Sequence, residues 1–376
     1  MTIVLAWRIL AYQKGRTALA LIGIFMAIVL VFIQLGLFFA VPQGGMLLYD
    51  NMNFDLLLVS DQYEFQGQPG AFPLDRLDRL RAAPGVAGAT PLYFGLAKWK
   101  GRTGGVWPDL FVIGFDPAAS LFLPRSIERQ RPVLDRPDTV LVDGTSRAIF
   151  GPLTTGRVVE IGTRSETIGG RYRLGTGFMG LGVALADTAN FARLFPRRSL
   201  AMANLGAIWL KPGIDPDNAA KALAARAGPG TRIFTRAAIA RAEAAYWTTR
   251  TSVGLIFGSG LVIAIVVGIM VVYQIVATQV GRQLPQFATL KAIGHSDGAL
   301  AGTVAAMSLF VAVAGFVPGL AASIWIYRLI RERTLLPVTM TVSHLVVVFV
   351  ATLIMAALSA LLALGGLRRA DPADVF

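Results

Sequence analysis

The chain has 376 residues, which is enough for about two or three soluble domains, but its composition excludes a purely soluble protein. Hydrophobic residues make up 55% and charged residues 15%, with a mean hydropathy of +0.60, whereas soluble domains carry about 25% charged residues. The absence of cysteine excludes disulfides and Cys-ligated metals, and the only histidines, His295 and His344, are far apart in the sequence. No basic stripe with interleaved aromatics accompanies the net charge of +13, so we expect no nucleic-acid partner. We also expect no cofactor and no metal on this chain.

The N-terminal segment, residues 1–17, combines apolar side chains at helical spacing with three cations. Ile3, Trp7 and Leu10 are the apolar members. This pattern predicts an interfacial helix that lies on the cytoplasmic membrane surface and contacts membrane lipids.

Four uncharged apolar blocks follow. Each is longer than the roughly 20 residues that a helix needs to cross a bilayer. A cleaved signal peptide is the alternative for the first block, Leu19–Val41, but signal peptides have shorter apolar regions of about 7–15 residues. We therefore predict four transmembrane helices, over residues 18–41, 253–277, 299–327 and 345–367.

Short-loop charges predict the orientation. The N-terminal segment, the 278–298 loop and the 368–376 tail carry seven cations on one side, against three in the opposite loop, 328–344. Cytoplasmic loops are enriched in Lys and Arg. This bias predicts a multi-pass protein of the bacterial inner membrane with both termini in the cytoplasm and residues 42–245 outside.

Two amides, Gln34 and Gln274, lie inside predicted spans. Such side chains either join helices by hydrogen bonds or line a substrate path. The first interpretation is favoured.

The segment 42–245 changes to short alternating runs broken by Gly and Pro, which predicts a mixed α/β extracytoplasmic domain, in two subdomains, inserted between helices 1 and 2. The stretch Arg236–Ala245 is rich in alanine and lacks Gly and Pro, so we expect the last helical patch to continue into the second span as one rigid stalk. The residues that would soften this helix near the membrane surface are Thr248, Thr249, Thr251, Ser252 and Gly254. The predicted strands are Leu56–Val59, Leu110–Ile113, Val140–Val142, Val158–Ile161 and Ala207–Leu210, and the helical patches are Leu74–Ala82, Asp217–Ala227 and Ala237–Thr249.

One stretch, residues 175–180, has the form G-x-G-x-x-G. A dinucleotide site also needs a preceding strand, a following helix and an acidic residue about 20 positions on, and Asp187 is too near. A turn or lipid-facing loop is favoured. No phosphate-binding loop or catalytic constellation occurs, so this chain is not expected to be an enzyme.

The loop between the second and third spans carries a short apolar face with Lys291 beside it. The residues alone predict two structures equally well: an interfacial helix that rests on lipid, and a coupling helix that is seated on a partner protein. The face is made by Phe287, Leu290 and Ile293.

This loop and the tail, Arg368 to Phe376, resemble the MacB/FtsX-like ABC transporter permeases, whose corresponding loop has an E-x-A-T-L-K-A-I-G core. External stretches such as Gly114-Phe115-Asp116-Pro117 and Asp187 to Pro196 are similar to the DevC-like branch. The chain departs from the family pattern at Gln286, where an acidic residue is usual. The resemblance implies an ATPase-coupling segment made of Leu284, Pro285, Gln286, Phe287, Ala288, Thr289, Leu290, Lys291, Ala292, Ile293 and Gly294.

That resemblance also implies the function: a homodimeric permease, bound to a separate ABC ATPase that holds ATP and Mg, which relays ATPase motion to the periplasmic side. It implies outward export of a glycolipid or other lipid-like cargo with a periplasmic membrane-fusion adaptor and an outer-membrane channel. The alternative is an FtsX-type signal transmitter that activates cell-wall hydrolases without moving cargo.

Overall fold

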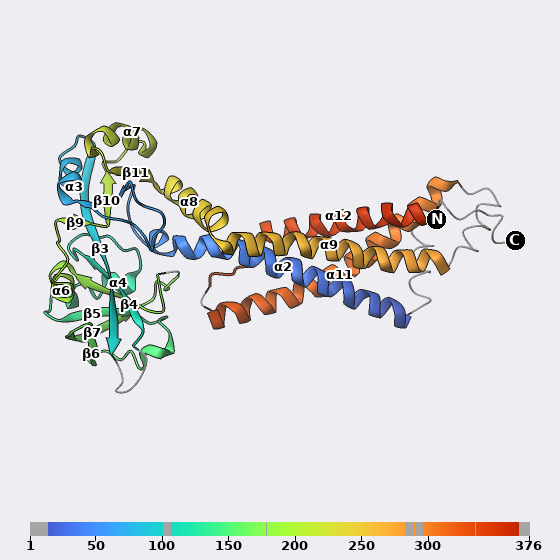
Figure 1. Cartoon of the computed structure of the whole chain (residues 1–376), viewed down its shortest axis with the longest axis horizontal. Helices are drawn as coiled ribbons and strands as arrows, with labels where there is room; N and C mark the ends of the chain where they lie inside the picture. Colours follow the sequence, from blue (N-terminus) through green and yellow to red (C-terminus); the bar gives the residue numbers. More distant parts are fainter. Residues whose placement is uncertain are drawn as a thin grey trace. The chain divides into compact units, whose positions relative to one another are not determined.

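The computed structural model describes residues 14–100, 107–177, 179–282, 289, 296–334 and 336–367. The chain forms two compact units: a helical unit of Met1–Ala40 with Ser252–Phe376, and an inserted domain of Val41–Thr251. Figure 1 shows the long helices of the first and the sheet of the second. The predicted fold class, an α-helical membrane protein with a mixed α/β domain between helices 1 and 2, is confirmed.

Within the described residues, four helices are long and apolar enough to cross a membrane. The first continues well beyond the predicted end at residue 41, because its last turns are buried in the core of the inserted domain. These helices are α2 (Lys14–Asp50), α9 (Ser252–Arg282), α11 (Asp297–Thr334) and α12 (Val342–Leu367).

Small residues let the helices of the helical unit approach closely. Gly315 and Gly319, one turn apart on α11, lie against Ile24 and Ile28 of α2 at distances that leave no room for a further carbon. The Tyr327 hydroxyl of α11 donates to the Phe32 carbonyl of α2. Such close small-residue contacts are typical of helix packing in lipid, where burial of apolar surface supplies little attraction.

The two span amides differ in their surroundings. Gln34 lies against Gly260 of α9 and therefore contacts a second helix. Its Oε1 is buried without a hydrogen-bond partner among the described residues, so the hydrogen bond of the favoured interpretation is not found there. Gln274 is exposed on α9.

The inserted domain is built on one nine-stranded mixed sheet in the order β11-β1-β10-β3-β4-β8-β5-β7-β6. The pairs β4–β8 and β5–β7 are parallel, and the sheet curls so that β6 also pairs with the end of β3, with Trp99 opposite Ile161. One sheet therefore runs through the described domain, in place of the two subdomains that we expected. The strands are β1 (Leu56–Ser60), β3 (Val86–Lys100), β4 (Asp109–Phe115), β5 (Thr139–Asp143), β6 (Val158–Ile161), β7 (Arg164–Tyr172), β8 (Val183–Asp187), β10 (Leu205–Leu210) and β11 (Thr231–Thr235), with a separate pair of β2 (Phe72–Pro73) and β9 (Met202–Ala203).

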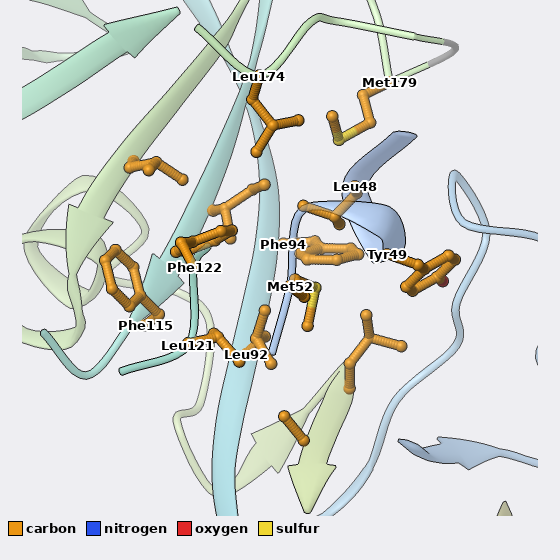
Figure 2. Close-up of a cluster of buried hydrophobic side chains, with 14 of the residues drawn as sticks. Leu48, Tyr49, Met52, Leu92, Phe94, Phe115, Leu121, Phe122, Leu174 and Met179 are labelled. Carbon is orange, nitrogen blue, oxygen red and sulfur yellow. The ribbon is translucent and has the colours of Figure 1, made fainter. Parts of the chain in front are cut away.

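Apolar side chains alternate along the strands and fill a core on each face of the sheet. One core packs against α3 (Leu74–Arg81), α6 (Thr188–Leu194) and α7 (Pro216–Ala227). The other packs against the end of α2 and against α8 (Arg236–Ala245). Figure 2 shows part of this second core, with Leu48, Tyr49 and Met52 from the α2 end beside Phe94 of β3. The domain also contains the short helices α4 (Arg125–Glu128) and α5 (Arg131–Leu134) and a 3-10 turn at Ala148–Phe150.

The predicted continuous stalk helix is wrong. After α8 the chain forms a π-helical turn, Tyr246–Arg250, and Thr251 is extended with φ −110° and ψ 152°. Hydroxyls of Thr248, Thr249 and Thr251 each donate to the carbonyl four residues earlier. Such bonds compete with the regular helix and bend it.

Three predicted segments lie outside the described residues: most of the N-terminal interfacial helix, the tail 368–376, and the coupling segment 284–294, of which Thr289 alone is described, as an exposed helical residue.

Candidate functional site

The inserted domain joins the end of α2 to α8 through a polar cluster, which we call the stalk junction and in which Tyr49, Tyr63 and Glu243 are buried and Arg236 and Trp247 half-buried. It consists of Tyr49, Tyr63, Arg236, Glu243 and Trp247. In the chain, α2 leads into the domain, and α8 leads out of it towards α9.

Arg236 anchors one end of the junction. Its guanidinium donates to the carbonyl oxygens of Tyr49 (2.8 Å), Met52 (2.7 Å) and Phe54 (3.3 Å). The last carbonyls of a helix have no partner within that helix, and a cation at this end also complements the helix dipole. The guanidinium lies 4.3 Å from the centroid of the Phe54 ring. Arg236 thus caps α2 from the first residue of α8.

Glu243 anchors the other end. It follows Arg236 by seven residues, so that two helical turns place both side chains on one face of α8. Its carboxylate accepts from the Tyr63 hydroxyl, the Gln66 backbone amide (2.7 Å) and Trp247 Nε1 (3.3 Å). The hydroxyls of Tyr63 and Tyr49 lie 2.7 Å apart. A chain of hydrogen bonds therefore runs from α8 through the loop after β1 to α2.

Burial controls the ionisation of this cluster. Glu243 is fully buried, and desolvation raises its pKa to about 7, although the donors Tyr63, Gln66 and Trp247 oppose that rise. Desolvation also raises the pKa of Tyr63 well above its ordinary value, with smaller contributions from Tyr49 and Glu243. Tyr63 therefore remains a hydrogen-bond donor across the physiological range.

Gly45 sets how closely the two helices approach. A Cβ at this position would lie 2.7 Å from Trp247 Nε1 and 2.9 Å from Glu243 Oε2, which is closer than such atoms can pack. The Gly44-Gly45 pair inside an apolar helix was the sequence signal for this crossing, and the lone acid of the alanine-rich helix, Glu243, was a second. Sequence reasoning used neither of them.

The predicted coupling residues, 284–294, cannot be placed against the stalk junction, because they lie outside the described part of the chain apart from Thr289. The G-x-G-x-x-G stretch lies in an irregular connection between β7 and β8 and not between a strand and a helix, as the favoured interpretation required. Among the described residues no group of three or more His, Asp or Glu is placed to hold a metal ion.

Two protein-family models match this chain. The MacB-like periplasmic core domain matches residues 17–226, and the FtsX-like permease C-terminal domain matches residues 258–372. The chain therefore belongs to the MacB/FtsX-like permeases of ABC transporters, which are membrane transport components and not themselves catalytic.

Solved structures similar to the chain include two isolated domains. One is the periplasmic region of MacB from Actinobacillus actinomycetemcomitans, with 10% identity, a TM-score of 0.36, and coverage of 50% of this chain and 92% of that chain. The other is the extracellular domain of the noncanonic ABC-type transporter YknZ from Gram-positive bacteria, with 11% identity, a TM-score of 0.32, and coverage of 48% and 99%. A comparison with curated protein sequences gives no significant match.

Proposed function

We propose that this chain is the permease subunit of an ATP-driven export complex and that the stalk junction passes ATPase motion to the inserted domain. The observation that supports this most directly is the union of α2 and α8, by Arg236 directly and by Glu243 through the hydroxyls of Tyr63 and Tyr49. The chain of α2 is one helix from Lys14 to Asp50, and its last turns pack in the core of the domain, so the proposed relay runs through these turns. This role replaces the continuous α8–α9 stalk that the sequence predicted.

The family implies an ABC ATPase as partner, and ATP and Mg would be bound there. We further propose a homodimer in the bacterial inner membrane, with both termini cytoplasmic and the inserted domain outside. Reporter fusions at Asp135 and Ala292 test this orientation, because the first should report the outer side and the second the cytoplasm. Both reporters on one side would contradict it.

For the cargo we propose a glycolipid or another lipid-like molecule, exported with a periplasmic adaptor and an outer-membrane channel. The similarity to DevC-like permeases supports this choice. Few charges occur within the four apolar helices, which disfavours a polar path between them. Co-purification of an adaptor with the permease–ATPase complex would support export, whereas co-purification of a cell-wall hydrolase would favour the FtsX-type signal transmitter.

The relay is tested without knowing the cargo. The chain has no cysteine, so Asp217→Cys on exposed α7 gives a single site for a fluorescent label. With the ATPase bound, we expect ATP to change the label's fluorescence in the otherwise unchanged protein. Glu243→Ala should remove that change while ATPase binding persists, because it leaves the Tyr63 hydroxyl and the Gln66 amide without their acceptor.

Glu243→Gln is the matched control, since its amide oxygen still accepts from Tyr63 and should retain most of the response. An undiminished ATP response in Glu243→Ala would show that the stalk junction does not carry the motion.

A further inference from the structure

Two loops of the inserted domain, which we call the basal loops, lie together beside the last turns of α2. They comprise residues 144–151 and 173–182, residue 178 excepted. A Cβ added at Gly177 would lie 2.5 Å from the Gly44 carbonyl oxygen, and one at Gly175 would lie 2.4 Å from Leu47 Cδ2. Both glycines have positive φ, 50° and 99°, which favours glycine. The loop therefore follows the surface of α2 as closely as a backbone can.

Asp143, at the end of β5, holds the two basal loops together. Its buried carboxylate accepts from the Thr145 amide (2.8 Å) and hydroxyl (2.7 Å) and from the amides of Leu174 (3.2 Å) and Gly175 (2.7 Å). The Arg147 amide also donates to the Leu181 carbonyl (2.9 Å). Figure 2 shows Leu174 and Met179 above Leu48 of α2, where all three belong to one core.

The position of the basal loops along α2 is fixed by helix geometry. If the hydrocarbon ends near Val41, as the apolar block predicts, Gly44 and Leu47 follow by about 5–9 Å at 1.5 Å per residue. Headgroups extend about 5–8 Å beyond the hydrocarbon on each side of a bilayer. The contact of the basal loops with Gly44 falls within this range, and the contact with Leu47 lies just beyond its outer edge.

The surface of the basal loops suits an anionic interface. Ile149 is 50% and Leu181 40% exposed. Arg147 and Arg173 are exposed, and neither takes part in an ion pair among the described residues. The stretches 144–157 and 173–182 contain no Asp or Glu. Apolar tips flanked by cations are the pattern of protein surfaces that dip among anionic headgroups.

We propose that the basal loops contact the headgroups of anionic phospholipids in the membrane that α2 enters. Ile149 and Leu181 reach the interface, and Arg147 and Arg173 bind the lipid phosphates. This contact is independent of the proposed export function and holds the base of the domain against the membrane surface.

The test uses the full chain in nanodiscs, with Leu181→Cys carrying a fluorophore and with lipids that carry a quencher on the headgroup. We expect quenching several-fold stronger than at Met202→Cys, a control of similar exposure, 38%, in the strand pair β2–β9. Ile149→Cys provides a second label if Leu181→Cys does not fold.

Charge is tested in discs of phosphatidylcholine alone and of phosphatidylcholine with phosphatidylglycerol. Quenching at position 181 should be stronger in the anionic discs, and the pair Arg147→Gln and Arg173→Gln should remove that excess. Quenching equal to that at position 202, or equal in both lipid mixtures, would overturn the proposal.

Discussion

Arg236 donates to the carbonyl oxygen of Tyr49 at 2.8 Å, and so the first residue of α8 caps the last turn of α2. Two segments that are 187 residues apart in sequence are thereby fixed to one another. The bond is charge-assisted and partly buried, and such bonds contribute more than neutral ones.

Replacing Arg236 tests this cap. Arg236→Ala removes the charged donor from the carbonyls of Tyr49, Met52 and Phe54, leaving Tyr49 with the Met52 backbone amide, and we expect a loss of about 2–4 kcal/mol in the free energy of unfolding of the inserted domain. Denaturant unfolding measures the loss. Arg241→Ala, on the exposed face of the same helix, is the control and should change stability by less than about 0.5 kcal/mol. Equal effects of the two variants would contradict the cap.

Gly45 provides a steric test of the crossing between α2 and α8. Gly45→Leu must displace Trp247 and Glu243, and overpacking of this kind costs about 1–3 kcal/mol. We expect a lower unfolding midpoint for the inserted domain. Gly281→Ala on α9 is the control, because no described residue has an atom within 4 Å of its added Cβ. An unchanged midpoint in Gly45→Leu would show that the two helices do not cross closely.

Asp143 should control the order of the basal loops. Asp143→Asn replaces one acceptor oxygen by a donor, so at least one of its four bonds is lost at a buried position, at a cost of about 1–3 kcal/mol. We expect faster proteolysis within residues 144–182. The control Asp135→Asn changes an exposed residue, and this variant should be cleaved at the rate of the unchanged protein. Equal proteolysis rates for the two variants would contradict the role of Asp143.

Glu166 predicts a pH dependence. Its carboxylate is fully buried on β7 and has no hydrogen-bond partner among the described residues. Desolvation, helped by Asp138 and Asp187 and opposed by Arg164 and Arg193, raises its pKa to about 7. A raised pKa means that the folded state favours the neutral form of Glu166. At pH values above the pKa of Glu166 in the unfolded chain, its ionisation therefore lowers the free energy of unfolding.

The contribution of Glu166 to stability should therefore fall as pH rises from about 4.5 to 7 and remain constant above, with a loss of up to about 3 kcal/mol. Glu166→Gln should unfold at a higher temperature than the unchanged protein at pH 8, whereas the two should differ little at pH 4.5. Glu243, with a pKa also near 7, contributes in the same direction, so the comparison is made with Glu243 intact. A variant that melts no higher at pH 8 would contradict the prediction.

The coupling segment remains a prediction from the sequence. Leu290→Asp should place a carboxylate where the short apolar face meets the ATPase, and burial of one Leu contributes about 1.5–3 kcal/mol. We expect loss of ATPase binding from a permease that still inserts into the membrane, measured by co-purification. Normal affinity would show that residues 284–294 do not couple the two proteins.

Local composition was sufficient for the four apolar helices and for the five short strands, because hydropathy and alternation are properties of neighbouring residues. The 15-residue strand β3 was missed, since Gly88, Pro91 and Gly95 interrupt its pattern. Pairing with β10 and β4 on its two sides maintains it as a strand despite those residues.

The stalk shows the limit of local reasoning. Alanine content predicted α8 correctly, and the threonines before the second span indicated a softer stretch, but the full break at Thr251 was not predicted. The sequence by itself determined the membrane class, the inserted α/β domain and the family, because these depend on apolar length and local motifs. Only the tertiary structure decided that α2 continues to Asp50 and that Arg236 and Glu243 meet it. Those contacts join segments far apart in the chain, and their stability comes from buried polar groups that satisfy one another only after folding.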